Sequence, residues 1–284
     1  MLDIYPLVTV FIPTYNGGKW LFDTINSVLS QDYQEYILIV SDDCSSDDTV
    51  EIAKSFKDRR ISVIENQSNL NVKHSAKLLK QCNSKYVKFL MQDDVLERDC
   101  LRRQVAFMEN HPDVGVTSSS YYLIFNFNKS SLKYNGYRNG KHANCRRLMR
   151  ELLLRGNRIG SPSQALFRTS VLQGKPMSWS YPYLGELTWY YYVFSQGYCY
   201  YHSTRPLSGY RVQADMKTLT LGGSTLTEYK KFIEQAGYLC SIRLNFYTLL
   251  LLHFSNYVRF FKKCLSRLVL RILIKSSMAF IYFR

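Results

Sequence analysis

Two adjacent carboxylates, Asp93 and Asp94, follow directly on the apolar run 86–91. Such a run predicts a buried strand, and two carboxylates at its exit cost free energy unless a cation neutralises them. Hard divalent cations such as Mg²⁺ and Mn²⁺ prefer carboxylate oxygens and commonly share them with the phosphates of a substrate. Most pairs of adjacent aspartates are solvated turn residues, so the prediction of a divalent metal site that serves a phosphorylated ligand depends on the residues around this pair.

Two further polar clusters stand at comparable places earlier in the chain. The segment 13–16 (P-T-Y-N) follows the β-branched run 7–12, and the acidic segment 41–43 (S-D-D) follows the apolar run 36–40. If all three runs are parallel strands of one sheet, their carboxyl ends meet at the same edge. We therefore expect the three clusters to form one ligand site.

The elements that would position these clusters alternate between strand and helix over the first 110 residues. Apolar runs predict buried strands, and apolar residues three or four apart predict amphipathic helices. The predicted strands are 7–12, 36–40, 61–65 and 86–91, and the predicted helices are 19–30, 49–56, 72–82 and 101–110. This order predicts an α/β fold with a mostly parallel central sheet and helices on both faces.

The second half, from about residue 113 to 215, has a mixed pattern. Its predicted strands are 114–118, 121–127 and 163–167, and its predicted helices are 146–154 and 186–195, the latter with an aromatic face. We expect this half to complete the cleft opposite the first half.

Three motifs together resemble glycosyltransferase family 2: V-T-V-F-I-P-T-Y-N at 8–16, V-S-D-D-C-S-S-D-D-T at 40–49 and K-F-L-M-Q-D-D-V-L at 88–96. The resemblance extends over residues 7–212. It implies the GT-A fold, a nucleotide-sugar donor and inversion at the anomeric carbon. It also implies a catalytic domain at 1–215, with a nucleotide-binding half at 1–112 and an acceptor half at 113–215.

The resemblance assigns the donor pocket to the first two clusters. Pro13, Thr14 and Tyr15 would line the nucleotide, with the tyrosine ring packed against the base. Asp43 matches the aspartate that contacts uracil in the family, which favours a UDP-linked donor. For Asp42, as for Asp47, turn formation or helix capping is the interpretation that we favour.

By the same resemblance Asp93 would contact the ribose and Asp94 would hold Mn²⁺ or Mg²⁺, the expected cofactor. The metal would neutralise the diphosphate that leaves. One departure affects this site, because Gln213 stands where family members often have a histidine near the metal. A second departure is N-L-N at 69–71 in place of N-x-G, a turn that asparagine tolerates.

An inverting transfer needs a general base, and the resemblance assigns this role to Glu186 in L-G-E-L-T-W (184–189). Glu186 is the only acidic residue between Glu151 and Asp215. The alternative is that it only caps the helix that follows. The turn 160–163 (G-S-P-S) resembles a family turn near the active site, although an ordinary turn before a strand explains it equally well.

The basic charge is concentrated in one part of the chain. The net charge is +15, and residues 230–284 contain ten Lys and Arg against one acid, Glu234. We expect a helical basic extension at 216–284 whose amphipathic stretch 257–268 docks on an anionic membrane surface. The alternative is a helix that packs on the catalytic domain with its basic face in solvent.

The predicted location is cytoplasmic, peripheral on the inner face of the cell membrane. The seven cysteines form no C-x-x-C pair, which favours a reducing compartment, and no signal peptide is expected. A lipid-linked or other glycan acceptor in bacterial surface polysaccharide synthesis (capsule, O-antigen or exopolysaccharide) would fit this location.

Other classes of protein fit less well. A non-catalytic protein that binds nucleotide sugars or glycans through the same fold is the main alternative. A nucleic-acid partner is not expected, because the basic residues form no groove-reading motif. A dinucleotide-dependent oxidoreductase is excluded, because the first strand ends in P-T-Y-N-G-G and lacks G-x-G-x-x-G.

Overall fold

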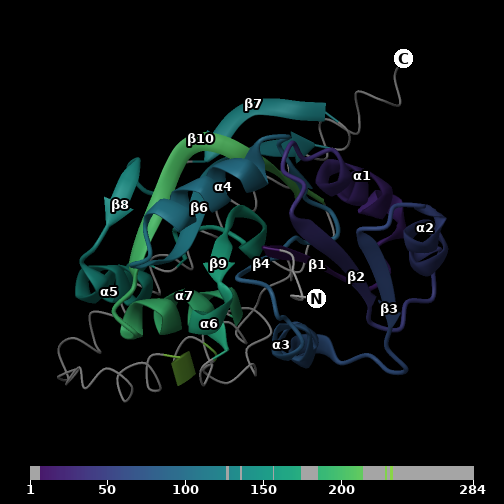
Figure 1. The fold of residues 1–284 in the computed structure, drawn as a ribbon, viewed down its shortest axis with the longest axis horizontal. Helices are drawn as coiled ribbons and strands as arrows, with labels where there is room; N and C mark the ends of the chain where they lie inside the picture. The colour runs from purple at the N-terminus through teal and green to yellow at the C-terminus, as the bar shows by residue number, and fades with distance from the viewer. Residues whose placement is uncertain are drawn as a thin grey trace, which may run out of the picture.

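A computed structural model of the chain describes residues 7–125, 128–134, 136–155, 157–173, 185–213, 228 and 231–232 (Figure 1). These residues form a ten-stranded mixed sheet with helices on both faces. The strand order is β3-β2-β1-β4-β9-β6-β10-β5, with β7 beside β6 and β8 beside β10. The longer pairings are parallel and the shorter ones antiparallel, in agreement with the expected mostly parallel sheet.

The first half is a parallel α/β sheet, as predicted. Its strands are β1 (Val8–Thr14), β2 (Tyr36–Asp42), β3 (Ile61–Glu65) and β4 (Tyr86–Phe89). Its helices are α1 (Gly18–Leu29), α2 (Thr49–Ser55), α3 (His74–Lys80) and α4 (Cys100–Asn110). The helix predicted at 72–82 begins instead as the 3₁₀ turn Asn71–Lys73, because Asn71 has a left-handed backbone (φ 50°).

Alternation along β1 divides the core into two layers. Val8, Val10 and Ile12 are buried on the face that α1 and α4 cover, whereas Phe11 belongs to the opposite face with α3. Successive side chains of a strand point to opposite faces, so a strand buried on both sides needs apolar residues at almost every position. Figure 1 shows α1 and α2 on one side of β1 and β2, with α3 on the other.

The second half contains β6 (Val114–Phe125), β7 (Asn128–Tyr134), β8 (Gly140–His142), β9 (Leu166–Arg168) and β10 (Cys199–Val212). Its helices are α5 (Cys145–Arg155), α6 (Thr169–Leu172) and α7 (Gly185–Ser195). The two strands predicted at 114–118 and 121–127 are a single strand, β6. Its T-S-S-S segment does not break it, because these polar residues are buried against β10.

The strand predicted at 163–167 is also displaced. Pro162–Gln164 forms a 3₁₀ turn, and the Ser161 hydroxyl accepts a hydrogen bond from the Ser163 amide at 3.2 Å. Pairing begins only at Leu166, where β9 lies antiparallel between β4 and β6. β9 thus joins the two halves into one sheet.

β10 crosses the second half as a long arc beside β6 (Figure 1). Its last residues pair antiparallel with the two-residue strand β5 (Val95–Leu96), which comes directly after Asp93 and Asp94. At the same position Gly209 lets β10 pass close to β6, because a Cβ there would lie 2.6 Å from side-chain atoms of Tyr122 and Ile124. The end of β10 is therefore held against the acidic pair.

The remaining sequence expectations fall largely outside the described residues. Of the basic extension at 216–284 the structure describes residues 228 and 231–232, and the docking helix expected at 257–268 lies outside the described residues. Within the described residues, no helix is both long enough and apolar enough to cross a membrane. The five cysteines that the structure describes are all free thiols.

A buried histidine connects β6 and β10. The His202 ring is fully buried, with Nδ1 3.1 Å from the Ser118 hydroxyl and Nε2 3.3 Å from the Ser120 hydroxyl. Burial, with a smaller contribution from His142, lowers the pKa of His202 to about 4. The folded protein therefore needs this ring in its neutral form.

This histidine predicts a loss of stability in acid. The unfolded chain takes up a proton near pH 6.5 while the folded ring stays neutral down to about pH 4. We expect about 3 kcal/mol of the free energy of unfolding to be lost as the pH falls through this window. Urea unfolding at pH 7.5, 6 and 4.5 should show a smaller loss for His202→Gln. His111→Gln should behave as the parent, and equal acid sensitivity of both variants would contradict the assignment.

Candidate functional site

The end of β1 lies against the end of β2, as the parallel register requires. Thr14 is paired with Asp42, and the Thr14 hydroxyl donates to Asp42 Oδ1 at 3.1 Å. Asp42 Oδ2 accepts the Ser45 amide at 2.8 Å, which confirms its turn role. Asp47 accepts hydrogen bonds from the amides of Gly18 and Thr49 at 3.1 and 3.2 Å, and so joins the starts of α1 and α2.

Tyr15 is presented to solvent by a contact with the acidic segment. Its amide donates to Gln92 Oε1 at 2.8 Å, and Gln92 Nε2 donates to the Tyr15 carbonyl at 3.2 Å. The side chain is 48% exposed. Gly17 leaves room for this pair, because a Cβ there would lie 2.5 Å from the Gln92 amide group. An exposed ring fixed through its backbone is well placed to pack against a flat ligand.

Asp43 is buried beside the same strand ends. Its carboxylate accepts the amides of Leu70 and Asn71, both at 2.9 Å, and the Asn66 side-chain amide at 3.2 Å. The left-handed Asn71 directs its amide onto the acid, so the turn expected at 69–71 is present. The Leu70 amide also lies 3.0 Å from the second oxygen, so each Asp43 oxygen accepts two hydrogen bonds and the carboxylate is firmly oriented.

His74 stands behind Asp43. Its Nε2 lies 2.7 Å from the Ser41 hydroxyl, and its Nδ1 lies 4.0 Å from Asp43 Oδ1. Burial lowers the pKa of His74, with the Asp43 charge opposing this effect. The neutral ring therefore contributes orientation rather than charge.

Asp94 is the most deeply buried acid of the three clusters, with 1% of its surface exposed. Oδ1 accepts the Arg211 amide of β10 at 3.1 Å, whereas Oδ2 is buried and has no hydrogen-bond partner among the described residues. Burial, reinforced by the neighbouring Asp93 charge, raises the pKa of Asp94 well above its usual range. Such a group is stable as an anion only when a cation joins it.

Asp93 is held from β10 and α1. Gln213 donates from Nε2 to Asp93 Oδ2, and its Oε1 accepts the Trp20 indole N–H at 2.8 Å. Arg211 donates from Nε to the Asp93 carbonyl at 2.9 Å, and its guanidinium lies 4.2 Å from the Trp20 ring centroid. Gln213 therefore uses both ends of its amide to position Asp93.

A divalent cation fits this arrangement on chemical grounds. The orphaned Asp94 Oδ2 is a hard oxygen donor, and Mg²⁺ or Mn²⁺ typically takes one or two carboxylates together with substrate phosphates. The described residues contain no group of three or more His, Cys, Asp or Glu side chains that would hold a metal. A cation bound to Asp94 could therefore share its coordination with oxygen atoms of a phosphorylated ligand.

Glu186 lies in the first turn of α7, and Asn157 connects it to the turn 160–163. Asn157 Nδ2 donates to Glu186 Oε1 at 3.3 Å and to the Gly160 carbonyl at 2.8 Å. At the far end of the turn, the Ser163 hydroxyl accepts the Met91 amide at 3.0 Å, just before the acidic pair. The turn thus links the two sides of the candidate site.

Lys88, which the sequence motifs did not single out, is the penultimate residue of β4 and so lies close to the edge of the sheet that carries the clusters. Lys88 in β4 is fully buried, and its Nζ donates to Gln104 Oε1 at 3.1 Å and the Ala165 carbonyl at 3.0 Å. Burial lowers its pKa, and the Asp94 charge opposes this effect. A lysine inside a predicted buried strand is the signal that would have found it.

The comparisons with known proteins can now be set beside this geometry. The model of Glycosyl transferase family 2 matches residues 9–174, more than half of the chain. The chain belongs to glycosyltransferase family 2. The matched residues include all three strand-end clusters but not Glu186 or Gln213.

Curated relatives of this family 2 chain match over its first part. The Bacillus subtilis protein "Putative teichuronic acid biosynthesis glycosyltransferase TuaG" is 38% identical over 112 residues, which are 38% of this chain and 44% of TuaG. The Escherichia coli protein "UDP-Glc:alpha-D-GlcNAc-diphosphoundecaprenol beta-1,3-glucosyltransferase WfaP" is 34% identical over 124 residues, 43% of this chain and 48% of WfaP. The chain spans less than half the length of these relatives.

Solved structures of Staphylococcus aureus TarS share the fold. TarS 1–349 in complex with UDP has a TM-score of 0.61 at 17% identity, over 98% of this chain and 93% of TarS. Its complex with UDP-GlcNAc has a TM-score of 0.64 at 18% identity, over 81% and 66%. At these identities the likeness concerns the fold, and it confirms the GT-A-like architecture that the family resemblance implies.

The burial of Asp94 leads to a prediction for the stability of the metal-free protein. Above the usual aspartate pKa, Asp94 ionises freely in the unfolded chain. In the folded chain it must keep its proton or bury a negative charge, so its free-energy penalty for folding rises with pH. In EDTA at pH 8, Asp94→Asn should raise the melting temperature by about 2–6 °C, and by less at pH 4.5. Asp113→Asn, at a surface ion pair, is the matched control. Destabilisation by Asp94→Asn at pH 8 would contradict the description.

Proposed function

We propose that this chain is an inverting glycosyltransferase that transfers a sugar from a UDP-linked donor to a glycan or lipid-linked glycan acceptor in bacterial surface polysaccharide synthesis. The observation that carries the proposal is the half-satisfied, buried carboxylate of Asp94 at the edge where Thr14, Tyr15 and Asp43 also lie. A donor diphosphate with its cation is a ligand that completes it.

The donor would bind along the strand ends. Tyr15 offers an exposed ring for the base, and Asp43, held by the amides of Leu70 and Asn71, would accept the N3–H of uracil. Asp93, with one oxygen fixed by Gln213, would take the ribose hydroxyls. TarS structures have been solved in complex with UDP and with UDP-GlcNAc, and the name of WfaP includes UDP-Glc, which supports a uridine donor here.

Asp94 would hold the divalent cation, which when bound supplies positive charge to the leaving diphosphate. Glu186 would take the proton from the acceptor hydroxyl on the other side of the site. Asn157 orients the glutamate through its hydrogen bond to Oε1. With base and leaving group on opposite sides of the transferred sugar, direct displacement inverts the anomeric carbon.

The acceptor and the location rest on the relatives. The name of TuaG refers to teichuronic acid biosynthesis, and that of WfaP to an acceptor carried on a diphosphoundecaprenol lipid. An acceptor of this kind lies at a membrane, so we propose a peripheral location on its cytoplasmic face. The basic extension at 216–284 would supply the contact with anionic lipid.

Donor binding tests the nucleotide site. In calorimetric titrations with Mn²⁺, UDP should bind more tightly than GDP or dTDP, and EDTA or Asp94→Asn should weaken UDP binding by about tenfold or more. Asp113→Asn should bind as the parent. If the folded protein binds none of these nucleotides, the proposed function is wrong.

The base assignment has a separate test. Glu186→Gln should slow UDP release from the preferred UDP-sugar, in the presence of a lipid-linked glycan extract, by about 10²–10⁴-fold. UDP affinity should stay within about twofold, because Glu186 lies away from the strand ends. Glu109→Gln, at a surface ion pair with Lys85, is the control. Near-normal turnover by Glu186→Gln would remove Glu186 from the reaction, whereas UDP binding without turnover in the parent would favour a non-catalytic binding protein.

A further inference from the structure

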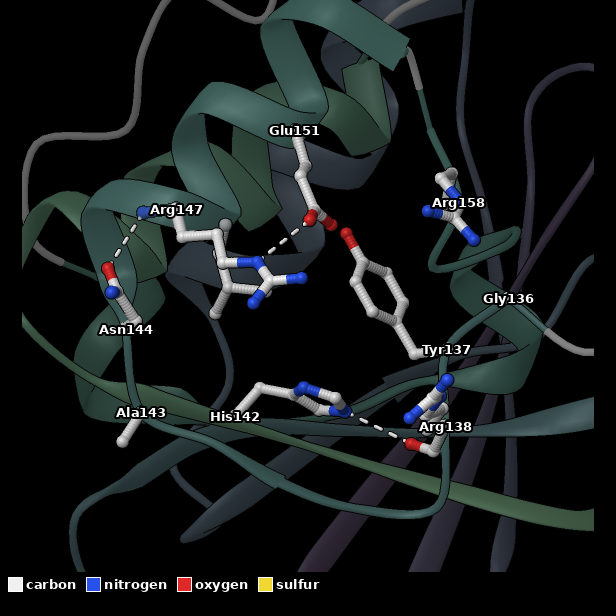
Figure 2. Close-up of a pocket in the computed structure, with 10 residues that line it drawn as sticks. Gly136, Tyr137, Arg138, His142, Ala143, Asn144, Arg147, Glu151 and Arg158 are labelled. Carbon is white, nitrogen blue, oxygen red and sulfur yellow. Dashed lines mark hydrogen bonds and ion pairs between the residues drawn. The ribbon is translucent and has the colours of Figure 1, made fainter.

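A large cavity lies in the second half of the molecule, away from the strand-end clusters (Figure 2). Its volume is about 740 Å³, and it opens between α5, β8 and the segments 136–138 and 157–159. None of Thr14, Asp43 or Asp94 lines it. The volume is within the range of small-molecule sites, so a ligand of one or two sugar units would fit.

The cavity has an excess of positive charge. Three arginines line it, Arg138, Arg147 and Arg158, against one acid, Glu151. Arg147 pairs with Glu151 at 3.0 Å, four residues along the same helix. No ion pair is observed for Arg138 or Arg158 within the described part of the chain. Two guanidinium groups in one cavity without an observed counter-charge favour an anionic ligand, above all one with planar or tetrahedral oxygens.

The Arg158 side chain and the backbone of the turn that carries Arg138 are held in place. The Arg158 guanidinium lies 5.2 Å from the Tyr137 ring centroid, and Figure 2 shows the two side chains facing each other. The backbone at Gly136 approaches the Arg158 carbonyl so closely that a Cβ there would lie 1.8 Å from it. The turn that carries Tyr137 and Arg138 is therefore fixed against the segment that carries Arg158.

An aromatic wall adjoins the arginines. The Tyr137 ring centroid lies 5.2 Å from that of His142 and 5.3 Å from that of Tyr200, and His142 stacks on Tyr200 at 5.6 Å. Tyr137 and His142 both line the cavity. Aromatic faces beside charged hydrogen-bond donors suit a sugar ring that carries an acidic group, because the ring packs on the apolar face and the acid meets the arginines.

One short segment joins this cavity to the predicted base. Arg158 lines the cavity, and the preceding residue, Asn157, donates to Glu186 Oε1 at 3.3 Å. Asn157 Oδ1 in turn accepts the amides of Ile159 and Gly160 at 3.0 and 3.1 Å, which fixes the segment. A chain-like acceptor with its reactive hydroxyl at Glu186 would therefore have this cavity next along its path.

We propose that the cavity binds an oxyanion-bearing sugar or polyol unit of the acceptor, a phosphate or a carboxylate, through Arg138 and Arg158. The proposal rests on the proposed function for the identity of the ligand as an acceptor. It adds that the acceptor glycan is acidic and that its charged unit is recognised away from the bond being formed.

Three small probes test the charge requirement: sn-glycerol 3-phosphate, methyl β-D-glucuronide and the neutral methyl β-D-glucoside. Each is titrated into the parent protein saturated with UDP and Mn²⁺, and binding is followed by NMR. We expect at least one acidic probe to bind about tenfold or more tightly than the glucoside, since charge-assisted hydrogen bonds contribute that much. Whichever of the two acidic probes binds more tightly identifies phosphate or carboxylate as the natural acidic group. Equal binding of all three would overturn the proposal.

Arginine variants test whether the acidic probe binds in this cavity. Arg138→Gln and the double variant with Arg158→Gln should weaken binding of the acidic probe by about tenfold or more. Arg150→Gln is the matched control, because Arg150 is an exposed arginine of α5 that does not line the cavity. UDP affinity and the melting temperature should stay unchanged in Arg138→Gln, which has an exposed side chain. Unchanged probe binding in the folded double variant would refute the site.

The same preparations separate this proposal from the proposed function. In turnover assays the arginine variants should raise KM for an acidic acceptor with little change in kcat, since the cavity lies away from the reacting atoms. If the parent binds no UDP while the arginines still bind the acidic probe, the assignment of the ligand as an acceptor is wrong. If UDP binds and the arginine variants leave KM unchanged, the acceptor assignment is likewise wrong while the donor site stands.

Discussion

The buried carboxylate of Asp94 is the group around which the rest of the site is organised. One oxygen has the Arg211 amide, and the other has no partner in the part of the chain that the structure describes. Removing an ionised carboxylate from water costs several kcal/mol, and a single amide offsets only part of it. The surrounding residues are consistent with a site that trades stability of the empty protein for affinity toward a cation and its phosphates.

The end of β10 supplies most of that surrounding structure. β5 follows the acidic pair at once, and its pairing with Ser208 and Gly209 sets Arg211 and Gln213 beside Asp93 and Asp94. Gln213 donates to the Asp93 carboxylate side chain, and it is held in place itself. Its amide is engaged at both ends, by Trp20 and Asp93, so its contribution lies in fixing the acid that would hold the ribose.

The sequence was most informative where one local rule decides the structure. Strand-helix alternation predicted the parallel half, and strand ends predicted that Thr14, Asp43 and Asp94 share an edge. It was less informative where contacts with residues distant in the sequence determine the local structure. Strands were predicted at 114–118 and 121–127, but β6 is continuous, and the hydroxyls of Ser118 and Ser120 lie within hydrogen-bond distance of His202. Likewise, nothing local to Gln213 or Arg158 indicates which acid or aromatic ring each will meet.

The pairing of β10 with β5 has a consequence for how the protein reaches this state. Arg211 and Asp94 are separated by 117 positions, and the partners in β6 and β10 by about 85. Closing such long loops costs chain entropy before any contact repays it, which slows folding. During synthesis the first four strands emerge well before β10, so Asp94 spends that interval without its amide donor. The acidic edge therefore cannot acquire its native order before residues 208–213 arrive.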